Sequence, residues 1–128
     1  MGQLPAHSLQ QSWPWPDSLD ALRAAPAYHE LFLENDRVRV IHTHIPAGEV
    51  VPLHTHRWRG VAYLISSSHF VRRDHEGKVL LDSRQASTAA PNAQSVQWLE
   101  RLPPHTVENV GSSAISILII ELKDDPPG

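Results

Sequence analysis

Two histidines one residue apart, His54 and His56, are the side chains of this sequence best spaced for chemistry. Residues two apart in a β-strand point to the same face, about 6.6 Å apart along the chain, so both imidazoles can reach one ion while Thr55 faces away. A neighbouring strand can add His105 as a third ligand. Neutral imidazole suits first-row metals, and three protein ligands leave positions open for water or substrate, as in catalytic sites. The spacing therefore predicts a divalent-metal site.

Other kinds of site find no support in the sequence. The chain has no cysteine, so a metal must be held by histidine, carboxylate or water. The sequence also lacks the nucleophile elbow Gly-x-Ser-x-Gly, a Walker loop, Gly-x-Gly-x-x-Gly and His-Glu-x-x-His. Only the histidine pattern remains as a candidate site.

A second His-x-His pair, His42 and His44, lies in a run rich in Val, Ile and Thr. If Val38 and Val40 face the interior, strand parity places His42 and His44 there too and points Arg39 outward. The two histidines could then act as acid or base near the metal, or be hydrogen-bonded interior side chains without chemistry. The other histidines are expected on the solvated surface: His7, His29, His69 and His75.

The three residues that directly follow His56 are candidates for substrate binding. Trp58 continues the parity of His54 and His56 and could wall the cavity, with Arg57 and Arg59 beside it. Arginine holds a carboxylate through a two-pronged contact, although an arginine at the rim can also be a solvated surface charge.

The segments that position these residues are predicted to be strands. Short runs rich in β-branched residues are separated by turns, of which Pro46-Ala47-Gly48 and the hairpin at Gly77 are the clearest. This pattern indicates an all-β sandwich or barrel. The predicted strands cover residues 30–34, 37–45, 61–65, 69–73, 79–82, 95–99, 106–110 and 114–123.

Residues 1–27 differ from the barrel region, residues 28–123, because they are rich in Pro and Trp. One helical turn is expected there, capped by Asp17 or Ser18 and ending before Pro26. The extension is expected to pack on the barrel or on a partner subunit, and residues 124–128 are expected to be a disordered tail.

Charge and hydropathy limit the partners. The formal net charge of the 128 residues is −3, which provides no broad basic field for nucleic acid or an anionic membrane. No run approaches the roughly 20 apolar residues of a membrane span, so a cytoplasmic protein is expected. Both faces of residues 114–123 are apolar, which predicts a homodimer covering one face.

Two stretches resemble the motifs of the cupin superfamily. Residues 48–56 consist of Gly48, five further residues and then His54-Thr55-His56. Residues 103–109 contain a proline turn followed by His105 and Asn109. This resemblance to a small single-domain cupin implies a jelly-roll barrel, or double-stranded β-helix. It also implies that His54, His56 and His105 share one metal ion, which could be Fe, Ni, Zn, Mn or Cu.

The sequence departs from the cupin pattern in two places. The motif glutamate is absent, because Gly60 and Val61 stand at its positions, and the turn before His105 is shortened. A three-histidine site without glutamate resembles that of thiol dioxygenases. The resemblance predicts an Fe(II)-dependent oxygenase acting on a small anionic molecule, with a non-catalytic cupin that binds or senses a small molecule as the alternative.

Overall fold

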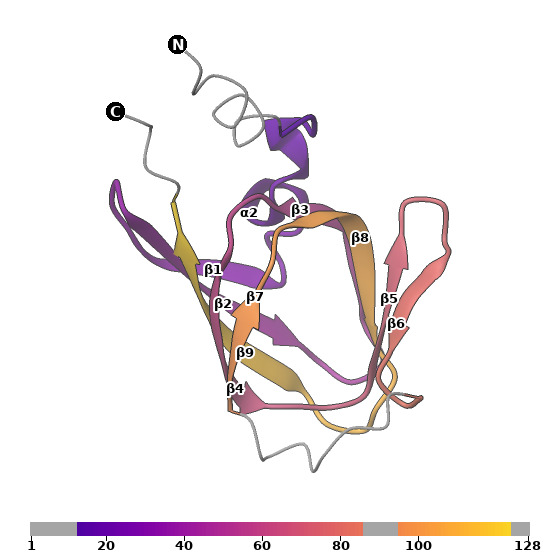
Figure 1. Ribbon diagram of the computed structural model, residues 1–128. Helices are drawn as coiled ribbons and strands as arrows, with labels where there is room; N and C mark the ends of the chain where they lie inside the picture. The colour runs from indigo at the N-terminus through magenta and orange to yellow at the C-terminus, as the bar shows by residue number, and fades with distance from the viewer. Residues whose placement is uncertain (1–12, 86–94, 124–128) are drawn as a thin grey trace.

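A computed structural model describes residues 13–85 and 95–123 and folds them into two facing antiparallel sheets (Figure 1). The expected tail, residues 124–128, lies outside the described residues, and so does the first part of the extension. The strands are β1 (His29–Glu34), β2 (Val38–Ile45), β3 (Val50–His56), β4 (Gly60–Ser66), β5 (Phe70–Asp74), β6 (Val79–Asp82), β7 (Val96–Leu99), β8 (Leu102–Asn109) and β9 (Ile115–Leu122).

The strand order is that of a double-sheet barrel. One sheet has five strands in the order β1-β2-β9-β4-β7, and the other has four in the order β3-β8-β5-β6. Every neighbouring pair is antiparallel. Apolar side chains from both sheets meet between them, around Ile45, Val51 and Ile115. The expected all-β jelly-roll barrel is confirmed.

Most strands lie within two residues of their expected positions, but β8 begins earlier than expected. Its first residue is Leu102, so Pro103 and Pro104 belong to the strand and not to a turn before it. The two turns that need glycine are as expected: Gly48 has a φ of +84° and Gly77 a φ of +87°, values that favour glycine.

The expected parity of β2 is wrong. The inward side chains are Arg39, Ile41, Thr43 and Ile45, so His42 and His44 lie on the opposite face. Arg39 can be buried because Glu121 accepts from its Nε at 2.7 Å and Asp20 accepts from its terminal nitrogens at 2.8 and 3.0 Å. An arginine flanked by two carboxylates escapes most of the penalty of burying a lone charge.

Two short helical elements precede the barrel. They are η1 (Asp17–Leu19) and α2 (Ala21–Ala24), and the side chain of Asp20 caps α2 by accepting from the backbone N–H of Leu22. The cap is therefore Asp20, not Asp17 or Ser18. Ala21 is fully buried where α2 contacts β3 and β1, above one end of the barrel in Figure 1. Among residues 13–85 and 95–123, no helix has the length and apolar character to cross a membrane.

Candidate metal centre

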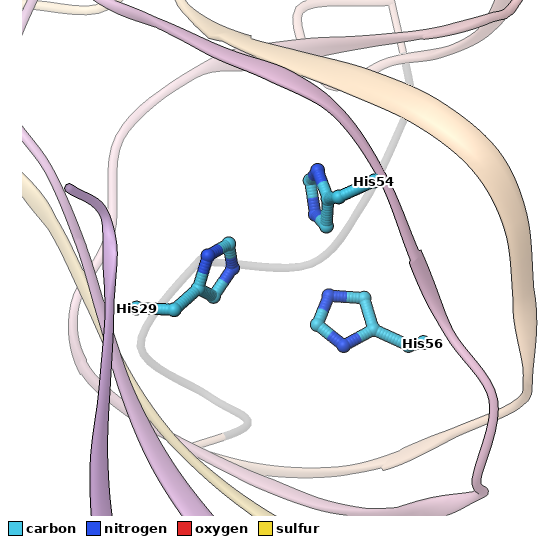
Figure 2. Close-up of side chains that lie close together, drawn as sticks. All are labelled: His29, His54 and His56. Carbon is cyan, nitrogen blue, oxygen red and sulfur yellow. The ribbon is translucent and has the colours of Figure 1, made fainter. Parts of the chain in front are cut away.

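Four histidine rings meet at one end of the space between the sheets. His54 and His56 come from β3, His105 from β8, and His29 from the first position of β1 in the other sheet. His54 and His105 are register partners with ring centroids 4.3 Å apart, and the centroids of His54 and His56 are 5.0 Å apart. Figure 2 shows His29 pointing across the cavity toward His54 and His56.

One nitrogen from each of His29, His54 and His56 can be chosen so that all three lie within 4.8 Å of one another. The His105 ring lies 5.7 Å from that of His56, centroid to centroid. The structure thus brings the predicted ligands His54 and His56 together with His29, and the predicted ligand His105 lies beside this group, its ring 4.3 Å from that of His54.

His29 was expected on the surface and is instead only 5% exposed. Its register partner is Thr43, which faces inward, so His29 faces inward as well. The signal that could have found it is this pairing, which becomes readable only once the parity of β2 is known. Because the parity of β2 was predicted wrongly, the inward direction of His29 could not be predicted either.

The hydrogen bonds of the four rings fix which nitrogen is free. Nδ1 of His29 lies 3.0 Å from the Ala25 carbonyl oxygen, and Nδ1 of His54 and of His105 lies 2.7 Å from the carbonyl oxygen two residues earlier, a proline in both cases. A carbonyl only accepts, so Nδ1 carries the proton and, in a neutral ring, Nε2 keeps its lone pair. Second partners of this kind orient metal-binding histidines.

Burial keeps three of the rings neutral, those of His29, His54 and His105. It lowers the pKa of His29 to about 4 and that of His105 to about 3, in both cases with help from the nearby His56. Burial also lowers the pKa of His54, next to His56 and His105. The rings are therefore ready to bind a cation at neutral pH without first losing a proton.

His56 is held by a carboxylate instead of a carbonyl. Its Nδ1 donates to Oε2 of Glu121 at 3.2 Å, and the other oxygen of Glu121 binds Arg39. Glu121 is fully buried on β9. A carboxylate behind a histidine raises the basicity of the ring as a ligand.

Gly60 cannot be replaced by the glutamate of the cupin motif. A Cβ at this position would collide with the backbone carbonyl oxygen of Ile120 and lie 3.0 Å from Cα of Glu121. The strands β4 and β9 approach so closely here that no side chain fits. A ligand at position 60 is therefore excluded by backbone packing, and His29 reaches the site from a different strand.

The rings border a cavity of about 180 Å³ between the sheets. Just over half of its lining residues are apolar, with Phe70 and Leu102 among the larger side chains. Two polar atoms of lining residues, Oγ1 of Thr43 and Nε of Arg72, are buried without a hydrogen-bond partner.

The residues predicted to bind substrate do not line this cavity. Arg57 and Trp58 line a separate groove with Asp20, and Arg59 binds Glu100 at 2.8 Å. Strand β3 ends at His56, so its alternation does not extend to Trp58.

The two predicted catalytic histidines also lie outside the cavity. His42 hydrogen-bonds Ser116 and stacks on Phe32, and His44 is exposed. Their assignment depended on the parity that proved wrong, so the structure gives it no support. The side-chain amide of Asn109 donates to the carbonyl oxygens of Ile45 and Ser113 and so joins two turns.

The donor set fits a first-row divalent ion. Four imidazoles, three of them with Nε2 left free by a carbonyl partner, match the preference of Fe(II), Ni, Cu and Zn for neutral nitrogen. Hard cations such as Mg²⁺ and Ca²⁺ prefer oxygen ligands. Among the described residues that line the cavity there is no carboxylate to supply them.

Three solved structures share the fold. A cupin domain from Bordetella pertussis Tohama I is 19% identical, with a TM-score of 0.56 over 75% of this chain and 92% of that one. An RmlC-like cupin with a double-stranded β-helix fold from Methanocaldococcus jannaschii is 13% identical, with a TM-score of 0.51 over 73% and 77%. The polyketide cyclase RemF from Streptomyces resistomycificus is 16% identical, with a TM-score of 0.52 over 84% and 75%.

These likenesses show the fold, and they confirm the resemblance to a small cupin at that level. The sequence itself matches no protein-family model and no curated protein.

Proposed function

Since the chain has the cupin fold and a buried histidine cluster that fits a metal, we propose that it is a metal-dependent enzyme of the Fe(II) oxygenase type acting on a small anionic molecule. The observation that carries the proposal is the set of neutral rings whose protonated Nδ1 atoms point away from a common centre. His29, His54, His56 and His105 would hold the ion.

The number of histidines bears on the kind of metal. Four imidazoles would fill a four-coordinate zinc site and close it, whereas an ion that accepts six ligands, such as Fe(II), keeps positions for exogenous molecules. The cavity beside the rings offers room for such molecules, which a closed structural site would not need. Iron bound in a nitrogen site of this kind supplies the redox chemistry that lets O₂ react with an organic substrate.

The residues of the chain would perform the remaining tasks. The aliphatic lining, which includes Ile117 and Ile119, would exclude bulk water and hold the apolar part of a substrate. Glu121 would keep the ring of His56 oriented, and the two proline carbonyls would do the same for His54 and His105.

The fold alone does not select oxygenation, since one of the similar structures is described as a polyketide cyclase. The absence of a carboxylate ligand favours oxygenation here, through the resemblance of the set His54, His56 and His105 to three-histidine dioxygenase sites, to which His29 would add a fourth ring. We also propose that the protein is a cytoplasmic homodimer that binds a small molecule.

The proposal is tested first by metal content. Protein purified without chelator should contain about one first-row ion per chain, and His54→Ala/His56→Ala should lose it, whereas His69→Ala should keep it because the His69 side chain is exposed and hydrogen-bonds Ser83. An ion present at 100 times its Kd would add about 2.7 kcal/mol of stability. Equal metal in the double variant and the wild type would refute the site.

The second test is turnover. The protein is loaded anaerobically with Fe(II), small acids and thiols are added, and a change in the iron spectrum followed by O₂ uptake is sought. Uptake that depends on both iron and substrate supports the oxygenase. Ligand-dependent spectral change without uptake would instead identify a binding or sensing cupin.

A further inference from the structure

Arg72 differs from four other arginines of the described residues, which bind carboxylates. Arg39, Arg59, Arg73 and Arg84 each bind a carboxylate at 3.0 Å or less. Arg72 lines the cavity from β5, its Nε is buried without a hydrogen-bond partner, and its nearest described interaction is with the Phe70 ring, 5.7 Å from the guanidinium carbon. Arg72 as a whole is only partly buried, but withdrawing part of a guanidinium from water without an anion still carries a cost, so its position calls for a cause.

The charges around the cavity are unbalanced. Among the described residues that line it, none is acidic, while Arg72 carries a positive charge and the histidines would hold a divalent cation. Glu121 lies behind His56 and already binds Arg39. Burial lowers the pKa of Arg72, and Arg72 in turn helps to lower that of His105, so the guanidinium lies close enough to the rings to be felt there.

A second polar atom lacks a partner at the same cavity. Oγ1 of Thr43 is buried on β2, in the sheet opposite that of Arg72, and makes no hydrogen bond within the described chain. Natural proteins rarely leave buried donors unsatisfied, so these two atoms are donors that a molecule bound in the cavity could satisfy. The guanidinium donates in a planar fork that matches a carboxylate.

We infer that Arg72, assisted by Thr43, binds the carboxylate of a small, mostly apolar organic acid whose other end lies toward the histidine cluster. This inference names the substrate class of the proposed metalloenzyme and rests on that function. It replaces Arg57 and Arg59, which do not line the cavity, as the residues that hold the anion.

The size of the cavity selects the probe. Cavities of roughly 150 Å³ take up benzene, and this one is about 180 Å³. Benzoate and benzamide therefore form a suitable pair, because they share a ring and differ in charge. Hexanoate and hexanamide provide the same contrast on a flexible chain.

The test is calorimetric titration of both pairs into the full chain, as purified and after removal of metal by chelation. We expect each acid to bind at least about tenfold more tightly than its amide, as charge-assisted hydrogen bonds predict. Arg72→Met should abolish the preference, and Arg72→Lys, which keeps the charge without the fork, should reduce it. The matched control is Arg73→Met, since Arg73 is the next residue on β5, binds Glu108 and does not line the cavity.

The outcomes separate this inference from the proposed function. A preference for acid that persists in metal-free protein and is lost in Arg72→Met supports the inference whatever the metal does. The inference is overturned if neither acid is preferred by the wild type, or if Arg72→Met, shown to be folded by tryptophan fluorescence, keeps the preference. Loss of metal from Arg72→Met is not expected, because Arg72 is not among the ligands.

Discussion

At the scale of single residues, the buried imidazoles link metal binding to acid stability. A histidine whose folded pKa lies below its usual value of about 6.5 binds fewer protons when folded than when unfolded. Its contribution to stability is therefore complete above about pH 6.5 and is lost as the pH falls toward the folded value. For His29 that window extends down to about pH 4, and for His105 to about pH 3.

We predict that metal-free protein loses about 2 kcal/mol of unfolding free energy for each of these two histidines between pH 7 and pH 5. Urea unfolding followed by tryptophan fluorescence measures the loss. His29→Gln, which can still donate to the Ala25 carbonyl, should remove its share of the pH dependence, while His69→Gln should not change it. The same slope in wild type and His29→Gln would contradict the assignment.

The sequence revealed three of the four rings because His54, His56 and His105 lie in motifs with recognisable spacing. His29 has no such context, and its direction depends on a long-range pairing with β2. Arg72 was missed for a related reason, since an arginine in a strand is normally expected at the surface, and its place in the cavity lining with a buried, unpaired Nε depends on contacts between distant strands.

At the scale of elements, a chain of buried charges joins four parts of the fold to the metal centre. Asp20 at the start of α2 binds Arg39 on β2, Arg39 binds Glu121 on β9, and Glu121 binds His56 on β3. The orientation of one ring therefore depends on segments that are far apart in the sequence. Breaking such a buried network costs more than removing an exposed pair.

We predict that Glu121→Gln lowers the unfolding free energy by about 3 kcal/mol and weakens metal binding by about 10- to 100-fold. The control is Glu100→Gln, whose exposed pair with Arg59 should contribute less than about 1 kcal/mol. Denaturant titration and competition with a chelator give the two quantities. Unchanged metal affinity in a folded Glu121→Gln variant would show that the carboxylate does not orient the ligand.

The strands could be predicted because each is a β-branched run bounded by Pro or Gly, and these are local signals. Which side chains of β2 point inward could not be predicted, because both alternating sets of side chains include apolar residues and one set also includes a charged residue. Arg39 faces inward because it pairs with the carboxylates of Asp20 and Glu121, and no local sequence pattern connects these two residues to Arg39.

At the scale of the whole molecule, the outer face of the five-stranded sheet is apolar over β4 and β7. Tyr63 on β4 pairs with Val96 on β7, and both are about half exposed, as are Trp98 and Ile65 nearby. The described part of the extension lies against β3 and β1 and does not cover these strands. A contiguous apolar face of this kind fits a second copy of the same sheet.

We predict that the protein is a dimer at micromolar concentration and that Tyr63→Arg/Val96→Arg makes it monomeric, because both changes place charge on the apolar face. Light scattering measures the change. The matched control, Leu80→Arg, places the same charge on an exposed position of β6 in the other sheet and should leave the dimer intact. A monomeric wild type would count against the assembly.

The position of His29 gives the metal centre a mechanical consequence. His29 belongs to the five-stranded sheet and the other three rings to the four-stranded one, and no strand pairing connects the two sheets within the described residues. An ion held by all four rings would act as a cross-link between the layers at one end of the barrel. Chelation should therefore let that end open locally, so that amide hydrogens of β1 and β3 exchange faster while those of the β5–β6 hairpin keep their rates.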